Sequence, residues 1–193
     1  MLQAPTSPKP LAMLSKERGR LLEIIKQKSL LKGHFKLTSG ASSNYYLDMK
    51  PTTFDPEGAF LVAEIIYSML KDEHDVDAVG GLELGAVPIV AAVCARSWQD
   101  RPINGFVVRK EMKSHGTGKQ IEGNFKPEAT VVLFDDVTTK GGSVLQAVRA
   151  VRERGATVKK IITIVDRLEG AGENLQKEGL ALEPIYTTRD LLG

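Results

Sequence analysis

The sequence predicts an α/β domain with a central, mostly parallel sheet flanked by helices, and three observations support this. The chain has 193 residues, of which 42% are hydrophobic and 26% charged, enough to bury the core of one globular domain. From residue 76 onward, short apolar runs alternate with helical runs, as in βαβ units. Polar segments follow these apolar runs. Ligands of parallel sheets bind beyond the carboxyl ends of the strands, so we expect the chemistry in the loops after Val79, Val108, Phe134 and Val165.

Composition narrows the classes of protein to consider. A formal net charge of +2 and a pI near 8.6 do not indicate a nucleic-acid-binding surface or an anionic membrane as partner. The longest apolar run, 86–95, is about half as long as the roughly 20 residues of a membrane span. The single cysteine, Cys94, excludes an internal disulfide, and its apolar neighbours predict a buried, unreactive thiol in a cytoplasmic protein.

The amino-terminal third is expected to hold a tail and two helices. Residues 1–14 contain three prolines and predict a disordered tail, not a signal peptide. A helix is expected from Ser15, its capping residue, in a unit that ends near Gly33. Asp55 and Pro56 begin a second helix as its N-cap and first residue. The apolar stripe of that helix is Phe60, Leu61, Ile65 and Met69.

The remainder reads as alternating strands and helices. We expect the helix that begins near Ser143 to end at Arg154, with Gly155 as its stop. No internal repeat is apparent. The expected strands are 76–81, 103–108, 130–134 and 158–166, and the expected helices are 86–96 and 143–154.

The segment 131–143, VVLFDDVTTKGGS, predicts a site for a ribose phosphate. Its small residues, Thr138 to Ser143, let backbone N–H groups and hydroxyls converge on an anion at the start of a helix. The preceding acids, Asp135 and Asp136, can accept hydrogen bonds from two neighbouring sugar hydroxyls. A Walker loop fits poorly, because Lys140 precedes the glycine pair. The alternative is a polar turn without a ligand.

A second segment, residues 109–123, carries several cations among glycines. We expect a mobile loop, since it has almost nothing to bury. Such a loop can close over a polyphosphate, although a solvated surface is the simpler interpretation when the segment is read alone. Its basic residues are Arg109, Lys110, Lys113, His115 and Lys119.

These two segments resemble those of a known family. VVLFDDVTTKGGS resembles the signature of type I phosphoribosyltransferases, and R-K-x-x-K-x-H-G in 109–116 resembles the catalytic loop of orotate phosphoribosyltransferases. The resemblance implies that Asp135 and Asp136 hold the ribose of 5-phosphoribosyl 1-diphosphate (PRPP), and that Lys113 and His115 are catalytic and stabilise the leaving diphosphate. The PRPP-binding residues implied are Arg109, Lys110, Lys113, His115, Asp135, Asp136, Val137, Thr138, Thr139, Lys140, Gly141, Gly142 and Ser143.

Three further segments resemble the same family. Residues 35–50 resemble its base-binding flap, with Tyr46 and Leu47 beside the pyrimidine; a turn followed by a half-buried strand is the alternative. Residues 166–175 place Arg167 where its planar fork can bind a carboxylate, and the family assigns Arg167 and Thr139 to orotate. Residues 80–88 resemble the diphosphate loop. Thr38 and Gly85 stand where some members have lysine, so those two contacts cannot be carried over.

The resemblance implies a type I phosphoribosyltransferase fold with a small N-terminal flap, or hood, and a mobile catalytic loop. The single domain would span 15–193, with the flap at about 15–50 and the core at about 51–193. Orotate and PRPP would be the substrates, with Mg²⁺ bound mainly through PRPP and no metal ligand set from the protein, in a homodimer with shared sites. Two alternatives stay open: a phosphoribosyltransferase for another base, and a PRPP-sensing regulator that binds nucleic acid. The region before Gly33 has neither helix-turn-helix length nor clustered arginines, which speaks against the regulator.

Overall fold

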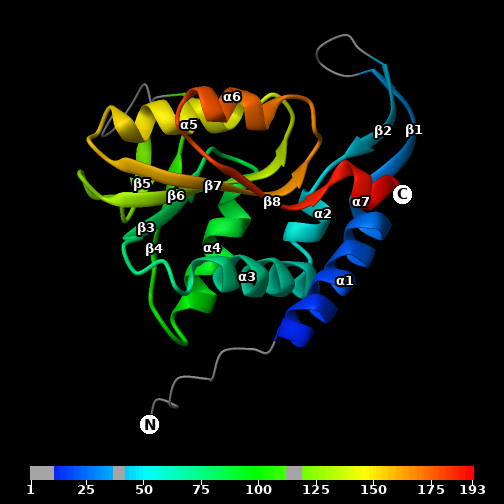
Figure 1. The fold of residues 1–193 in the computed structure, drawn as a ribbon, viewed down its shortest axis with the longest axis horizontal. Helices are drawn as coiled ribbons and strands as arrows, with labels where there is room; N and C mark the ends of the chain where they lie inside the picture. Colours follow the sequence, from blue (N-terminus) through cyan, green and yellow to red (C-terminus); the bar gives the residue numbers. More distant parts are fainter. Residues whose placement is uncertain (1–10, 37–41, 112–118) are drawn as a thin grey trace.

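The computed structural model describes residues 11–36, 42–111 and 119–193 and confirms the α/β class (Figure 1). Within these residues the main sheet has six strands in the order β5-β4-β3-β6-β7-β8. All neighbouring pairs are parallel except β4 and β5, which are antiparallel. The strands are β3 Ala78–Gly81, β4 Asn104–Val108, β5 Ile121–Gly123, β6 Thr130–Thr138, β7 Thr157–Asp166 and β8 Leu182–Thr187.

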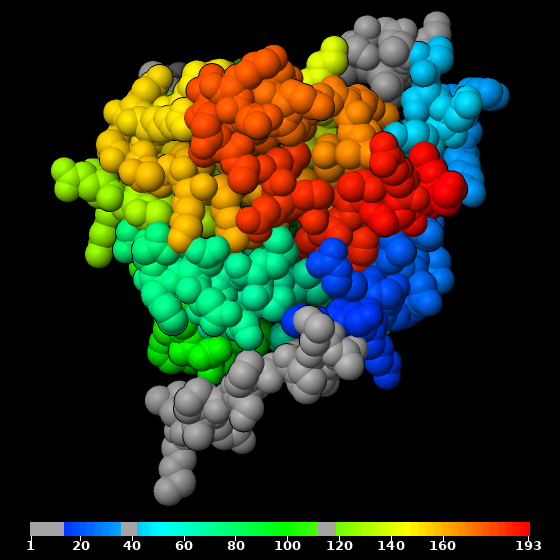
Figure 2. All heavy atoms as spheres, viewed as in Figure 1, coloured from blue at the N-terminus to red at the C-terminus, as the bar shows by residue number. Residues whose placement is uncertain are grey.

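Helices cover both faces of this sheet (Figure 1), and Figure 2 shows all atoms of the molecule in the same view. On one face lie α3, Pro56–Leu70, and α4, Ala86–Ser97, with α1, Leu11–Lys28, packed against α3. On the other face lie α5, Gly142–Arg152, and α6, Ala171–Lys177. Alternate side chains of β6 point to opposite faces of the sheet. Val132 and Phe134 belong to the apolar cluster that contains α3 and α4, whereas Leu133 belongs to the apolar cluster that contains α5.

A hairpin beside the main sheet forms the hood. It consists of β1, Leu30–Lys36, and β2, Ser42–Leu47, which pair antiparallel with an irregularity between Lys32 and Phe35. The short helix α2, Lys50–Thr53, follows and leads to α3. The helix α1 that precedes the hairpin contacts β8 and α7, Thr188–Leu192. There, the Arg18 guanidinium donates to the Ile185 carbonyl, and the Tyr186 hydroxyl donates to the Arg18 carbonyl at 2.6 Å.

Several expected boundaries were wrong. The first helix already includes Leu11, so Ser15 is not its cap, and Gly33 lies inside β1 with φ at 155° and does not end a helical unit. The cap of α3 is as expected: the Asp55 carboxylate accepts from Gly58 N at 2.9 Å. Phe60 is 55% exposed and does not belong to the buried stripe of that helix.

Other differences concern short elements and the cysteine. The strands β5 and β8 were not expected, and β5 occupies the end of the segment 109–123 that was read as one loop. The helix α5 ends at Arg152, not at Arg154. Cys94 is only partly buried, and this burial raises the pKa of its thiol. Among the described residues, no helix is both long and apolar enough to span a membrane.

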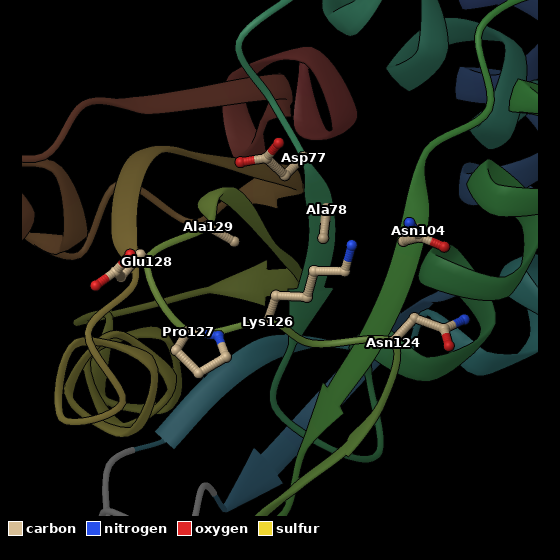
Figure 3. Close-up of a pocket in the computed structure, with 8 residues that line it drawn as sticks. All are labelled: Asp77, Ala78, Asn104, Asn124, Lys126, Pro127, Glu128 and Ala129. Atoms are coloured by element: carbon tan, nitrogen blue, oxygen red, sulfur yellow. The ribbon is translucent and has the colours of Figure 1, made fainter.

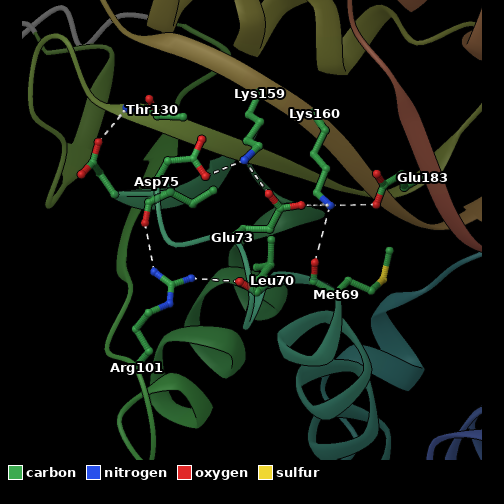
Figure 4. A network of polar contacts seen from close by, with 11 residues as sticks. Met69, Leu70, Glu73, Asp75, Arg101, Thr130, Lys159, Lys160 and Glu183 are labelled. Carbon is green, nitrogen blue, oxygen red and sulfur yellow. Dashed lines mark hydrogen bonds and ion pairs between the residues drawn. The ribbon is translucent and has the colours of Figure 1, made fainter. Parts of the chain in front are cut away.

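An ionic network joins the loop after α3 to the sheet at the edge where its strands begin (Figure 4). The Lys160 side chain in β7 is 9% exposed, and its Nζ lies 2.9 Å from a Glu73 carboxylate oxygen and 3.0 Å from one of Glu183 in β8. Lys159 pairs with Glu73 and Asp75. A buried ammonium group is costly without such partners. We therefore infer that the charged residues at this edge of the sheet stabilise the fold.

Candidate functional site

A polar cavity lies at the opposite edge, where β3 and β6 end. Its volume is about 220 Å³. It brings together four separate parts of the chain: the start of α2, the loop after β3, the end of β4 and the β6–α5 segment. The lining residues are Lys50, Leu82, Glu83, Leu84, Gly85, Lys110, Asp135, Asp136 and Ser143.

The two adjacent acids form the floor of this cavity. Asp135 and Asp136 lie within β6, which extends to Thr138 and so is longer than the predicted strand of 130–134. Asp135 is 7% exposed. Burial, followed by the charge of Asp136, raises the pKa of Asp135, and burial also raises the pKa of Asp136. A buried acid pair is costly unless a ligand satisfies it, which indicates a binding function.

The turn from β6 into α5 is braced by neighbouring elements. Gly141 has φ at 79°, a conformation that favours glycine, and precedes the first residue of α5. The Lys140 carbonyl accepts from Asn174 Nδ2 of α6 at 3.0 Å, and the Thr138 carbonyl accepts from Arg167 N at 2.9 Å. This turn therefore presents the start of α5, the positive end of the helix dipole, beside the acid pair.

The loop after β3 forms the opposite wall of the cavity. Its Glu83–Leu84 peptide bond is cis. The Glu83 carboxylate accepts from Lys110 N at 3.0 Å, and the Lys110 carbonyl accepts from Gln146 Nε2 at 2.8 Å, so the end of β4 is held between this loop and α5. A Cβ at Gly85 would collide with the carboxylate of Asp136. The loop therefore comes close to the acid pair, and a larger residue at position 85 would require the Asp136 side chain to move.

Arg167 lies beyond the end of β7, beside the hood. Its side chain is 8% exposed, its guanidinium carbon lies 4.8 Å from the centre of the Tyr45 ring, and its Nε lies 2.8 Å from a Glu169 carboxylate oxygen. An arginine held on one side by an aromatic face and at Nε by a carboxylate keeps its terminal nitrogens for a planar anion. Such an anion would lie between the hood and the main sheet.

The structure brings together many of the residues that the sequence singled out. Asp135, Asp136, Lys110 and Ser143 line one cavity, and Val137 to Gly142 continue from it into α5. Arg109 is half-buried and lies 3.9 Å from Glu122 in an ion pair. Tyr46 contacts Phe35 at 5.7 Å between ring centres, and Leu47 is 8% exposed, whereas the ring stacked on Arg167 is that of Tyr45. Lys113, His115 and Thr38 lie outside the described residues.

Sequence reasoning missed four residues at the site. Lys50, Glu83 and Tyr45 stood inside or beside segments already noted, but nothing in their local pattern showed which side chains face the cavity. Glu169 was also missed. The sequence contains one indication of a charged cluster near Lys50: this lysine follows an acid, Asp48, by two residues.

A second cavity, also of about 220 Å³, lies at the edge where the strands begin (Figure 3). It is lined by Asp77, Ala78, Asn104, Asn124, Lys126, Pro127, Glu128 and Ala129. Parallel sheets bind ligands at the carboxyl edge, so the cavity with the acid pair is the stronger candidate. No cluster of three or more His, Cys, Asp or Glu side chains suited to a metal ion occurs among the residues that the structure describes.

Known proteins agree with this geometry. Residues 54–183 match the family model described as phosphoribosyl transferase domain. An orotate phosphoribosyltransferase of Bradyrhizobium sp. is 46% identical over 183 residues, which cover 92% of this chain and 98% of the relative. The Aquifex aeolicus orotate phosphoribosyltransferase is 46% identical over 93% of this chain and all of the relative.

Solved structures give the same result. The Mycobacterium tuberculosis orotate phosphoribosyltransferase in complex with PRPP superposes with a TM-score of 0.78 at 32% identity, covering 92% of this chain and 99% of that one. The Aeropyrum pernix orotate phosphoribosyltransferase gives 0.73 at 32% identity over 95% and 96%. The chain therefore belongs to the orotate phosphoribosyltransferase family of phosphoribosyl transferase domain proteins.

Proposed function

We propose that this protein is an enzyme that transfers the 5-phosphoribosyl group of PRPP to orotate, giving orotidine 5′-monophosphate and diphosphate in pyrimidine (UMP) biosynthesis. One observation carries the proposal: the acid pair of β6 and the braced turn into α5 border a single cavity at the carboxyl edge of the sheet. A sugar phosphate carries hydroxyls and an anion on one molecule, so it can occupy both parts of this cavity. The family and its relatives named above support this assignment.

The acid pair and the turn divide the sugar between them. Asp135 and Asp136 accept hydrogen bonds from the 2- and 3-hydroxyls, which replace the water that their burial has removed. The backbone N–H groups and hydroxyls from Thr138 to Ser143 bind the 5-phosphate at the start of α5. The ribose is thereby fixed at both ends, so its anomeric carbon is held in one position for attack.

Charge separates as the reaction proceeds. The bond from C1 of the ribose to diphosphate breaks while N1 of the orotate anion forms the new bond, so the sugar becomes oxocarbenium-like and the leaving group gains negative charge. Arg109, Lys110, Lys113 and His115 stabilise that leaving group, and His115 can donate a proton to it. No general base is required because orotate reacts as its anion.

Orotate is recognised through its carboxylate. The terminal nitrogens of Arg167 bind that carboxylate, with Thr139 nearby and Tyr46 and Leu47 of the hood bordering the ring. The stacked position of Arg167 on Tyr45 supports this role, since it fixes the fork at the entrance between hood and sheet. A purine base lacks the carboxylate, which disfavours the alternative of a phosphoribosyltransferase for another base.

We also propose Mg²⁺ as cofactor, a homodimer with shared active sites, and a cytoplasmic location. Mg²⁺ prefers oxygen ligands and keeps few from the protein, and the acid pair offers carboxylate oxygens beside the place proposed for the diphosphate. When bound, the ion would neutralise charge on the diphosphate. Light scattering of the purified protein would give the mass that a dimer requires.

The test is a substrate assay. Purified protein with Mg²⁺ and PRPP is offered orotate, uracil, adenine and hypoxanthine in separate reactions, and the nucleotide products are resolved by chromatography. We expect orotidine 5′-monophosphate from orotate alone, and at least about tenfold lower turnover for Lys113→Ala. A product from a purine instead of orotate would refute the proposed substrate. PRPP binding without any product would favour a sensor.

A further inference from the structure

The charges around the cavity leave one lysine without an assigned role. The described walls carry three carboxylates, from Glu83, Asp135 and Asp136, and two ammonium groups, from Lys50 and Lys110. A diphosphate is a polyanion, and carboxylates alone would repel it. Its binding requires cations close to the acid pair.

The loop after β3 provides no such cation in this chain. Gly85 stands beside Asp136 where some family members have lysine, so the loop has no charged side chain at that position. The next residues, Ala86 and Val87, are apolar and begin α4. In this chain, a cation beside Asp136 therefore comes from another element that lines the same cavity.

Lys50, the first residue of α2, reaches that space. Its backbone N donates to a carboxylate oxygen of Asp48 at 3.0 Å, and its Nζ lies 2.6 Å from the same oxygen. These two contacts fix both ends of the residue, and the hydrogen bond to Asp48 raises the pKa of Lys50. The lysine is therefore charged at neutral pH, and its position is defined before any ligand arrives.

The same side chain stays available to a ligand. It is 50% exposed, and its charge acts on Asp136 against the burial that raises the pKa of that acid. An exposed ion pair such as that with Asp48 contributes about 0–1 kcal/mol, so exchanging one carboxylate for phosphate oxygens costs little. If Lys50 only stabilised the fold, its side chain would not need to be half exposed at the wall of the cavity.

We propose that Lys50 is a diphosphate-binding residue that supplies, from the start of α2, the positive charge that the loop after β3 lacks in this chain. This inference rests on the proposed function, because it takes the cavity to hold PRPP. It assigns the role of Asp48 as well: Asp48 is a positioning residue that holds the ammonium group toward the acid pair until the diphosphate binds.

The test compares three variants with the wild-type protein. Lys50→Gln removes the charge, and Lys50→Arg keeps it. Lys126→Gln removes an equal charge at the opposite edge of the sheet, in the cavity of Figure 3. For each, calorimetry measures the Kd of diphosphate with Mg²⁺ and of ribose 5-phosphate, kinetics give KM for PRPP and for orotate, and thermal unfolding reports the fold.

We expect Lys50→Gln to weaken diphosphate binding and raise KM for PRPP by about tenfold or more, as for the loss of one charged hydrogen bond. Ribose 5-phosphate affinity, KM for orotate and the unfolding temperature should stay within about twofold or a few degrees of wild type, and Lys126→Gln should match wild type throughout. Lys50→Arg should bind diphosphate within about threefold of wild type.

Two results would overturn the inference while the wild-type enzyme makes orotidine 5′-monophosphate. One is unchanged diphosphate affinity in Lys50→Gln. The other is an equal loss in Lys50→Gln and Lys50→Arg together with a lower unfolding temperature, which would mark a purely structural role. A wild-type protein without transferase activity would instead reject the proposed function, and diphosphate affinity would still report on Lys50.

Discussion

The close approach of Gly85 to Asp136 leaves little room for a side chain at position 85. We expect Gly85→Ala to push the carboxylate of Asp136 out of place and lower kcat/KM by about 10–100-fold, since small misplacements in an active site have effects of that size. The matched control is Gly19→Ala in α1, where a Cβ meets no atom within 4 Å. That change should leave activity intact and stabilise the helix by about 0.5–1 kcal/mol. Equal activity in both variants would contradict the steric account.

The raised pKa of Asp135 makes the ligand-free protein sensitive to pH. A carboxyl group whose pKa is higher in the folded than in the unfolded state lowers stability as pH rises from about 4 through the folded value. Asp135→Asn removes this cost. We expect its free energy of unfolding to match wild type near pH 4 and to exceed it by at least about 1 kcal/mol at pH 8, measured by urea unfolding without ligand.

Asp190, in the first turn of α7, provides a control whose pKa is shifted in the opposite direction. The pKa of Asp190 is lowered by its hydrogen bonds to the backbone and hydroxyl of Thr187. Asp190→Asn should therefore lose stability at neutral pH, and the loss should fade as pH falls through the lowered pKa. If both variants shifted in the same direction with pH, buried charge at Asp135 would not be the cause.

At the scale of elements, Lys160 ties β7 and β8 to the loop after α3 (Figure 4). Glu73→Gln leaves this buried ammonium with Glu183 as its remaining carboxylate partner among those described. We expect a loss of about 1–3 kcal/mol in the free energy of unfolding, the usual cost of an underpaired buried polar group. Glu178→Gln breaks the exposed pair with Arg152 and should change stability by less than about 0.5 kcal/mol. Equal losses in urea unfolding would mean that burial of Lys160 is unimportant.

Elements with a strong local pattern could be predicted from sequence, and weakly patterned ones could not. The cap at Asp55 and the strands of 130–134 and 158–166 follow from capping chemistry and continuous apolar runs. β5 has three residues and β8 contains Pro184, so neither shows a clear period, and each is defined by its neighbour in the sheet. The extension of β6 through the acid pair depends on pairing with β7, a tertiary effect.

At the scale of the whole molecule, the sequence predicts the class of ligand at the site but not which distant residues surround it. The segment 131–143 alone indicates a sugar phosphate, because the order of acids, small residues and helix start has a direct physical meaning. The proximity of Lys50 and Glu83 to that segment, and of Tyr45 to Arg167, depends on how the hood and the loop after β3 fold back across the sheet. Those contacts join residues about 50 to 120 positions apart in the sequence, and no local pattern encodes them.

The hydrogen bond from Tyr186 to Arg18 joins positions that are 168 residues apart. During synthesis on the ribosome, α1 can pack against α3 early, but its hydrogen bonds to β8 form only when nearly all of the described residues have emerged. A nascent chain would thus gain this support of the hood at the same stage as the last described strand of its sheet. A chain terminated before β8 would retain the acid pair of β6 but would lack the hydrogen bonds that join α1 to β8 and so support the hood.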